Sequence, residues 1–548
     1  MSLANAQVRA AMFNAIFSKV QGQFTTFGIF QYKDWFQNKL RFWLASINAS
    51  ALATIPKKIP CGVYQIIMAG LDSSFQDMSP ASQQDVYNFA KDYLTAKASQ
   101  GGAPCTENTR GSLGWLHTNL GSFSTLASYG ELIGLNADFS AVDAVAGLSP
   151  VQLASYVLAS DVLRDSDKAG KVFGSLNSHT IGEFLDAFNA AAQQQHLSQL
   201  PHADVRRFIL GEIFCHLSTV FKLFTTEDYA VWFGERLTLF LSSLEAQNLG
   251  FLPNDMSCDS LAAIVKILSD HKANGTYENP QDIFSFIKRV LHFQLQNSGS
   301  ACAQGITTDR QWLLQNFGLF TVYGSYSDFV TLNSRLHGHD SLDLFSASTL
   351  AQLSAQSNTI YSTAAIQLVF ETIRSKEEPL RHLSTYLDDL NTLLLKSSSL
   401  LGNSKVRDTM LMMSAEMVFP QITALSLEGT TTWLHRLNLL LAGVNATTLE
   451  LLPLTMPCPF YQAIINAVGG VYSELSARKR QDVYGFQKAY LTAQFTDSGS
   501  ACKDGTHGTR DWLQKNMGEF CSVAQLSELQ TFYPDIDGVS FSRQCAEQ

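Results

Sequence analysis

The stretch DVYNFAKDYL at residues 85–94 returns as DIFSFIKRVL at 282–291 and as DVYGFQKAYL at 482–491. Its apolar positions recur at three- and four-residue steps, which places them on one face of a helix. A Ser-Pro or Asn-Pro pair just upstream, at 79–80 and 279–280, is typical of a helix N-cap followed by a first-turn proline. A helical segment that recurs along a chain indicates tandem repeats that bury their apolar faces against neighbouring repeats.

Other motifs recur in step with this one. WLHTNLGSF at 115–123 returns as WLLQNFGLF at 312–320 and WLQKNMGEF at 512–520, each with a glycine (Gly121, Gly318, Gly518) suited to a helix C-cap. Val-Arg pairs open the repeats at residues 8, 205 and 406. We divide the chain into repeat 1 (1–204), repeat 2 (205–405) and a partial repeat 3 (406–548), whose back half is missing. The predicted fold is an all-α, armadillo/HEAT-like helical solenoid, a right-handed superhelix of units of about 200 residues with one disulfide per unit.

Composition excludes several classes of protein. The chain has 548 residues, 46% of them apolar, 16% charged, with a net charge of −10. Without a basic block to neutralise phosphates, nucleic acid is a poor partner. No apolar run reaches the 18 to 20 or so residues of a transmembrane segment. Arg9 interrupts what would be the apolar core of a signal peptide, and the last residues form no hydrophobic anchor signal.

The cysteines indicate disulfides. No Cys-x-x-Cys and no zinc-finger spacing occurs, so we expect neither a metal nor a cofactor. A spacing of 44 residues recurs three times and predicts one bridge per repeat: Cys61–Cys105, Cys258–Cys302 and Cys458–Cys502. Cys521 and Cys545 occur only in repeat 3 and can form a terminal clip. Cys215 is left over, and we favour a buried free thiol over an intermolecular bridge. Disulfides imply an oxidising, hence secreted or extracellular, location.

Three Asn-x-Ser/Thr sequons fit that location: Asn48, Asn274 and Asn445. Asn48 and Asn445 both lie 13 residues before the first cysteine of their repeats, where repeat 2 has Glu245. Because the position itself recurs, we predict glycans on Asn48 and Asn445, and less firmly on Asn274.

Nothing in the sequence favours catalysis. The motifs of serine hydrolases, zinc proteases and phosphate-binding loops are absent. His337, His339 and Asp340 form the richest polar cluster, but they are nearly consecutive and lack a distant fourth ligand, so we interpret them as a polar loop. Asp85, Asp282 and Asp482 are expected in the first turns of helices, where a carboxylate favours the helix dipole. Trp115, Trp312 and Trp512 are expected in the core. We therefore predict that the protein is not an enzyme.

Residues 115–158 (WLHTNLGSF through SYVL) resemble the mesothelin, stereocilin and otoancorin group of extracellular proteins. The similarity lies in Asn119 to Phe123, in Leu135-Asn136 with Phe139, and in Leu148-Ser149-Pro150 with Gln152-Leu153. Repeats 2 and 3 carry weaker copies. The resemblance implies a superhelical, glycosylated, non-catalytic protein with an adhesive or structural role at cell surfaces or in extracellular gels.

Two functions remain open. The first is a secreted adhesion or binding scaffold that takes protein or glycan ligands along its surface. The second is a structural protein that self-assembles head to tail into filaments or gel. The first helix carries Val8, Met12, Phe13, Ile16, Phe17, Val20 and Phe24 with few charges. We expect this face to be open and to mediate self-association, which replacement of Phe13 and Phe17 by Asp would abolish.

Overall fold

The protein is all-helical in the part of the chain that can be described. The computed structural model describes residues 5–99, 104–197, 199–357, 359–395, 401–495 and 501–545. Every regular element in these ranges is an α-, 3₁₀- or π-helix, and none of them contains a strand. The chain divides into two compact units, residues 1–286 and 287–548. The all-α prediction is confirmed.

The helices of the first unit are α1 (Ala6–Val20), α2 (Ile29–Lys33), α3 (Ala49–Leu52), α4 (Cys61–Asp72), α5 (Pro80–Ala98), α6 (Gly111–Asn119), α7 (Tyr129–Leu135), α8 (Ala141–Ala144), α9 (Pro150–Ala159), α10 (Ser166–Gly174), α11 (Thr180–Gln194), α12 (Ala203–Leu217), α13 (Thr226–Val231), α14 (Ala246–Leu249) and α15 (Cys258–Asn274). Two π-helical turns, η2 (Asp34–Lys39) and η9 (Trp232–Arg236), continue α2 and α13. Helix α16 (Pro280–Ser298) begins in the first unit and ends in the second.

The helices of the second unit are α17 (Asp309–Asn316), α18 (Tyr326–Leu332), α19 (Ala347–Gln356), α20 (Thr363–Ser375), α21 (Pro379–Leu394), α22 (Ser404–Val418), α23 (Leu427–Leu437), α24 (Ala446–Leu449), α25 (Cys458–Gly469), α26 (Ala477–Phe495), α27 (Gly508–Asn516), α28 (Leu526–Phe532) and α29 (Gly538–Cys545). Short 3₁₀ turns join many of the helices in both units.

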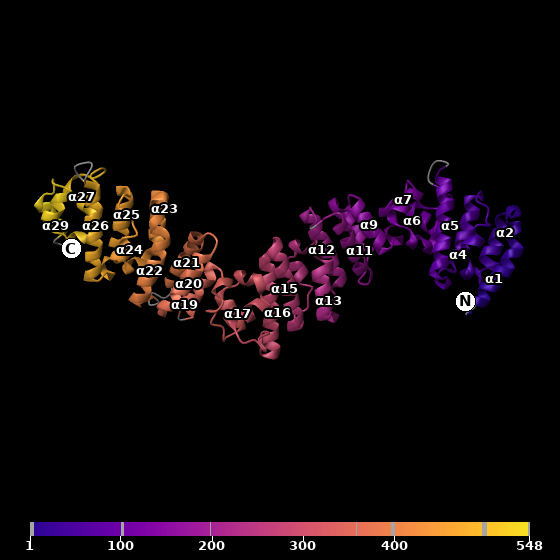
Figure 1. Ribbon diagram of the computed structural model, residues 1–548, viewed down its shortest axis with the longest axis horizontal. Helices are drawn as coiled ribbons and strands as arrows, with labels where there is room; N and C mark the ends of the chain where they lie inside the picture. The colour runs from indigo at the N-terminus through magenta and orange to yellow at the C-terminus, as the bar shows by residue number, and fades with distance from the viewer. Residues whose placement is uncertain are drawn as a thin grey trace. The chain divides into compact units, whose positions relative to one another are not determined.

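The sequence repeat returns helix by helix. Each repeat opens with a 15-residue helix, α1, α12 or α22, and contains a 19-residue helix, α5, α16 or α26, over the DVYNFAKDYL motif. Each helix packs mainly on helices near it in the chain, for example α4 on α2 and α6, and α10 on α12. Within each unit the helices therefore follow one another in chain order (Figure 1), which is the stacking of a solenoid.

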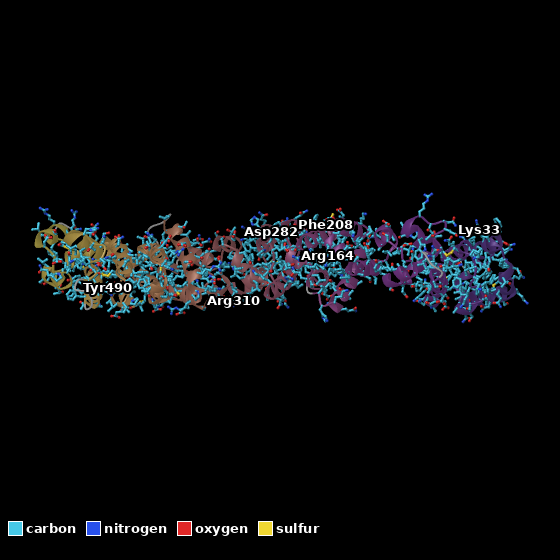
Figure 2. All side chains as sticks on the ribbon, turned by 90° about the horizontal axis from the view of Figure 1, so that it is seen from above. Lys33, Arg164, Phe208, Asp282, Arg310 and Tyr490 are labelled. Carbon is cyan, nitrogen blue, oxygen red and sulfur yellow. A yellow bond between two sulfur atoms is a disulfide. The ribbon has the colours of Figure 1, made fainter. Side chains whose placement is uncertain are left out.

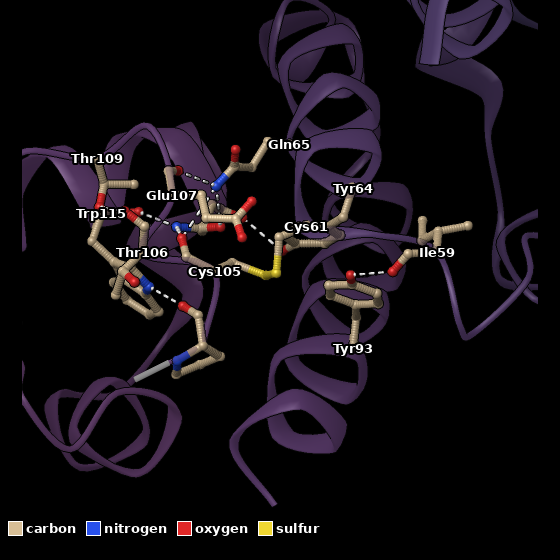
Figure 3. The surroundings of a disulfide bond; sticks show 12 residues. Ile59, Cys61, Tyr64, Gln65, Tyr93, Cys105, Thr106, Glu107, Thr109 and Trp115 are labelled. Carbon is tan, nitrogen blue, oxygen red and sulfur yellow. Dashed lines mark hydrogen bonds between the residues drawn. A yellow bond between two sulfur atoms is a disulfide. The ribbon is translucent and has the colours of Figure 1, made fainter. Parts of the chain in front are cut away.

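A disulfide anchors the centre of repeat 1. Cys61, the first residue of α4, is bonded to Cys105, in the loop between α5 and α6 (Figure 3). The Cys105 carbonyl accepts hydrogen bonds from the side-chain amides of Gln65 and Asn119, both at 3.1 Å. The buried Trp115 indole donates to the Pro104 carbonyl at 2.7 Å. These contacts fix a loop whose Cys105 has a φ of 51°, a left-handed conformation that a non-glycine residue rarely adopts.

The same arrangement recurs in the other repeats. Trp312 and Trp512 donate to the carbonyls of Ala301 and Ala501, both at 2.8 Å. Cys458 is bonded to Cys502, and Cys258 and Cys302 are both disulfide-bonded. Cys302 and Cys502 share the φ of 51°, and the three predicted C-cap glycines have φ between 52° and 55°. The tryptophans at 115, 312 and 512 are buried, as expected.

Two buried tyrosines complete this centre in repeats 1 and 3. The hydroxyl of Tyr64 donates to the Asn119 carbonyl at 2.6 Å, and that of Tyr461 donates to the Asn516 carbonyl at 2.7 Å. Burial raises the pKa of both phenols well above its usual value. Each phenol therefore remains a neutral hydrogen-bond donor that ties α4 to α6, or α25 to α27.

The recurring aspartates act in part differently from the prediction. Helices α5 and α26 begin at Pro80 and Ala477, so Asp85 and Asp482 lie beyond the first turn, and only Asp282 lies within one. Asp85 instead accepts a hydrogen bond from the Ala49 amide at 2.9 Å, and Asp282 one from the Ala246 amide at 2.8 Å. These carboxylates satisfy free amides at the starts of α3 and α14 and so join helices, and Asp282 also occupies the first turn of its own helix, as predicted.

Repeat 3 contains an additional bridge between Cys521, in the 3₁₀ turn η18 (Gly518–Val523), and Cys545 at the end of α29. Helix α29 packs on α27, as α8 packs on α6 in repeat 1. Cys521 and Cys545 stand where repeat 1 has Ser124 and Leu148. The bridge therefore holds α29 in the place that α8 takes in repeat 1.

Replacing Cys61 and Cys105 together with serine should lower the free energy of unfolding by about 2–5 kcal/mol, since the bridge closes a 44-residue loop. Denaturant unfolding of the variant and parent measures this. Cys215→Ser is the matched control and should leave the unfolding midpoint unchanged.

Peptide mapping without reduction should recover Cys61 with Cys105 and Cys458 with Cys502. Free thiols at both cysteine pairs would contradict these two disulfide bonds.

Candidate interaction surface

Repeat 1 exposes an apolar surface at its first helix and at the turns that follow α2. Val8 and Met12, on α1, are 45% and 41% exposed, and Phe42, just after η2, is 49% exposed. Trp35, in η2, and Trp43, next to Phe42 in the sequence, are partly exposed. We call these five residues, together with Lys39, the N-terminal face. Isolated exposed apolar residues are ordinary, but a group of large ones indicates an interaction site.

Most of the equivalent residues of repeats 2 and 3 are buried. Val205 and Ile209 take the positions of Val8 and Met12 in repeat 2 and are 7% and 0% exposed. Val406 and Met410 take them in repeat 3, and both are fully buried. In repeat 2 the counterparts of Trp35, Phe42 and Trp43 are also buried, namely Trp232, Leu239 and Phe240. In repeat 3 Trp433 and Leu440 are buried, whereas Leu439, at the position of Phe42, is 37% exposed.

A pair of helices covers this position in repeat 2. Helix α10 packs on α12, where the carbonyl of Phe173 lies 3.0 Å from Nε2 of His216. The ring of Phe208 on α12 (labelled in Figure 2) packs closely against Gly170 of α10. A methyl group at residue 170 would lie only 3.3 Å from the Phe208 ring, so glycine makes room for this ring. Helix α11 packs on η9, and Phe188 stacks on Phe240 with ring centroids 6.1 Å apart. In repeat 3, α20 and α21 pack on α22 and α23 in the same way.

Polar contacts fix the register of this packing. Asp186 of α11 accepts two hydrogen bonds from Arg236, both at 2.8 Å, and Arg236 lies 4.8 Å over the ring of Trp232. The hydrogen bonds that Arg236 donates to the carboxylate of Asp186 raise the pKa of Arg236. Asn189, one turn along α11, donates to the carbonyls of Glu235 and Arg236 at 2.9 Å.

The second helix pair repeats these contacts. Asp388 of α21 accepts from Arg436 at 2.9 Å, Arg436 lies 5.4 Å over Trp433, and Asn391 donates to the Arg436 carbonyl at 2.8 Å. An Asp followed three residues later by an Asn thus lies at both helix-pair interfaces.

Repeat 1 has the receiving half of this arrangement. Lys39 lies 4.7 Å over the ring of Trp35, as Arg236 lies over Trp232. Its ammonium group pairs with Asp34 at 2.7 Å, and both side chains are about half exposed. The hydrogen bond from Lys39 holds the pKa of Asp34 below its usual value. The N-terminal face therefore presents an aromatic ring and a cation where the other repeats bind a neighbouring helix.

The prediction that Phe13 and Phe17 lie on the open face is wrong. Phe13 is fully buried and Phe17 is 3% exposed, and the two rings stack at 5.0 Å. Val20 and Phe24 are buried with them. These residues point into repeat 1 itself, where Phe24 packs on Tyr32 and Phe36. Replacing Phe13 and Phe17 with Asp would disrupt the core of the repeat rather than test a surface.

The three sequon asparagines lie at the surface. Asn48 and Asn274 are exposed and Asn445 is half-buried. Asn48 and Asn445 cap the four-residue helices α3 and α24, since their side-chain oxygens accept from the amides of Ala51 and Thr448 at 3.0 Å. Glu245 stands at the same cap of α14. The position recurs because a helix starts there, so its recurrence is not by itself evidence for a glycan.

Cys215 differs from its prediction. It is a free cysteine, but it is exposed on α12 rather than buried. In α12 the buried face consists of residues such as Ile209, Ile213 and Phe214, and Cys215 falls outside it.

The His337–Asp340 segment is a loop held by its neighbours. Asp309 accepts hydrogen bonds from the amides of His337 and Gly338, both at 2.8 Å, and His339 lies 2.9 Å from the hydroxyl of Thr359. A hollow of about 460 Å³, lined by Trp312, Arg335, His337 and Asp340 among others, lies beside it. Among the described residues, no three His, Cys, Asp or Glu side chains cluster as metal ligands would.

Comparison with known proteins gives no assignment: neither the protein-family models nor the curated proteins that were searched match this chain. Among the helices described, none has the length and apolar character needed to cross a bilayer.

Leu239→Ala should lower the free energy of unfolding by about 2–5 kcal/mol, because Leu239 is 6% exposed and its truncation leaves a buried cavity. Phe42→Ala, at the equivalent position of repeat 1, should change it by about 0.5 kcal/mol or less. Denaturant unfolding of the two variants makes the comparison within one fold. Equal losses would show that Phe42 is covered and that the N-terminal face is not open.

Proposed function

We propose that this protein is a non-catalytic extracellular binding scaffold whose helical repeats bind other polypeptides, with the N-terminal face as a principal contact site. The observation that carries the proposal is the exposure of Val8 and Met12 at positions that are buried in repeats 2 and 3, together with that of Phe42, whose counterpart Leu239 is buried in repeat 2. Burying side chains of this size yields roughly 1.5–3 kcal/mol each, so a complementary partner gains substantially by covering them.

The cysteines support the extracellular part of the proposal. Eight of them are disulfide-bonded, six at positions that recur in all three repeats and two, Cys521 and Cys545, in repeat 3 alone. Disulfides persist in oxidising compartments, where surface sequons such as those at Asn48 and Asn445 are glycosylated. The resemblance of residues 115–158 to extracellular adhesion proteins favours the same location. Glycans are a second class of proposed ligand, after polypeptides.

The helix-pair contacts favour a scaffold over the alternative of head-to-tail polymerisation. A filament made of this chain alone needs a free helix pair to cover the N-terminal face of the next copy. Among the described residues, the two pairs of this kind, α10–α11 and α20–α21, are seated on α12 and α22 of their own chain.

Size-exclusion chromatography with light scattering distinguishes these functions. The scaffold should elute as a monodisperse monomer across a wide concentration range, with a molar mass near 60 kDa before any glycan is added. A molar mass that rises without limit as concentration increases would reject the scaffold in favour of a self-assembling structural protein.

Protein made in a secretory host should carry glycan on Asn48 and Asn445, and on Asn274 to a lesser extent. Intact mass before and after glycosidase treatment measures this, and Asn48→Gln and Asn445→Gln variants assign the sites. Loss of the Asn caps costs about 1 kcal/mol in each short helix, so these variants should still fold. An unchanged mass after glycosidase treatment of the parent would contradict the proposal that this protein is an extracellular glycoprotein.

A further inference from the structure

We propose that the N-terminal face binds a helix pair of the same kind as α10–α11, and that this pair is neither α10–α11 nor α20–α21 of this chain. This partner has an apolar first helix that lies along α1. Its second helix carries an Asp and, three residues later, an Asn, which face Lys39 and the main chain of η2. The inference rests on the proposed binding function and names the chemistry of its partner.

The chain itself contains two examples of this interface. In each, the first helix of the pair covers the opening helix of the following repeat, and the second helix covers the element that contains the tryptophan, η9 in repeat 2 and α23 in repeat 3. Asp186 and Asp388 reach the arginine that lies over that tryptophan, and Asn189 and Asn391 reach main-chain carbonyls beside it. Residues three apart lie on the same side of a helix, so one Asp-x-x-Asn segment makes both contacts at once.

The receiving residues of repeat 1 match those two interfaces in type and geometry. Val8 and Met12 provide the apolar strip of α1, and Lys39 provides the cation over Trp35 at 4.7 Å. The carbonyls that correspond to those of Glu235 and Arg236 belong to Asn38 and Lys39. Lys39 is about half exposed, so an incoming carboxylate can replace Asp34 as its partner without unfolding the turn.

The charges select the partner further. Arg236 is 23% exposed in its interface and its partner Asp186 is 52% exposed, so the ion pair lies at the rim of the apolar contact. A rim charge mainly sets register and specificity, whereas the apolar strip provides most of the affinity. A lysine at this position in repeat 1 still requires an acidic group on the second helix of the partner.

A second copy of this chain is the less suitable occupant. The α10–α11 pair of a second copy is seated on its own α12 and η9, and its α20–α21 pair on its own α22 and α23. Providing either pair would require that copy to open one of its own interfaces. A polypeptide with an unseated helix pair has no such cost.

The test adds the partner to the chain itself. A duplicate of residues 160–201 is placed directly before residue 5, a junction that reproduces the natural one because residue 202 corresponds to residue 5. The duplicate should cover the N-terminal face. Hydrogen exchange of peptides from 6–20 and 29–43, followed by mass spectrometry, should slow by about tenfold or more relative to the parent.

Matched variants test the predicted contacts. Asp186→Ala with Asn189→Ala, introduced only in the duplicate, should remove part of the protection. Lys39→Glu in the fusion should speed exchange by about twofold to fivefold, and Asp186→Lys in the duplicate should restore protection. Because Lys39 is half exposed, these changes leave the core of repeat 1 intact.

Several outcomes would overturn the inference. Exchange in the fusion that equals exchange in the parent would show that the face does not bind such a helix pair. If the fusion does not fold, a longer duplicate of residues 149–201 placed before residue 5, which adds the helix α9 on which α11 packs, gives the same readout with the same interpretation. A parent that forms a discrete dimer with 6–20 protected would show that a second copy is the occupant. If the fusion gains no protection from exchange while the parent is a monomer, only this inference is rejected. If the molar mass of the parent rises without limit as its concentration increases, the proposed function is rejected.

Discussion

The structure depends on one recurring contact, in which a pair of helices covers the start of the following repeat, as α10–α11 covers repeat 2 and α20–α21 covers repeat 3. The first helix of each repeat is apolar on two sides: one side packs inside its own repeat, as Phe13 and Phe17 do, and the other needs a neighbour. In repeats 2 and 3 the neighbour is present, and Val205 and Val406 are buried. In repeat 1 the same side is exposed at Val8 and Met12. A solenoid built in this way has an interaction surface wherever a first helix lacks a helix pair.

The interior of each repeat is fixed independently of that contact. The disulfide at the start of α4 or α25, the buried tryptophan and the buried asparagine hold one loop in a left-handed turn at Cys105 or Cys502. Several contacts together over-determine a backbone conformation that would otherwise be unfavourable. Because this centre lies away from the first helix in the sequence, a repeat can present an exposed end while its own interior stays ordered.

Much of the architecture could be predicted from the sequence, because repetition reveals which residues act together. The helices, the C-cap glycines, the core tryptophans and six of the eight bridging cysteines follow from local patterns that recur three times, whereas Cys521 and Cys545 occur in repeat 3 alone. Residue patterns did not show which side of the first helix meets its own repeat, since Val8, Met12, Phe13 and Phe17 are all apolar. The arginine over Trp232 and the Asp-x-x-Asn of α11 gave no local signal either, because their meaning lies in a contact between helices about 50 residues apart. The N-terminal face becomes visible only when the exposure of side chains at equivalent positions is compared between the repeats.

The central claim is that equivalent positions differ only in whether a helix pair covers them, and one pair of methionines tests it directly. Met12 and Met410 occupy the same position in repeats 1 and 3 and are 41% and 0% exposed. Methionine oxidation depends on exposure, so dilute hydrogen peroxide compares the two sites within one molecule. Peptide mass spectrometry over a time course should show sulfoxide at Met12 well before any appears at Met410 in the folded protein, and equal rates after denaturation. Equal rates in the folded protein would contradict the account.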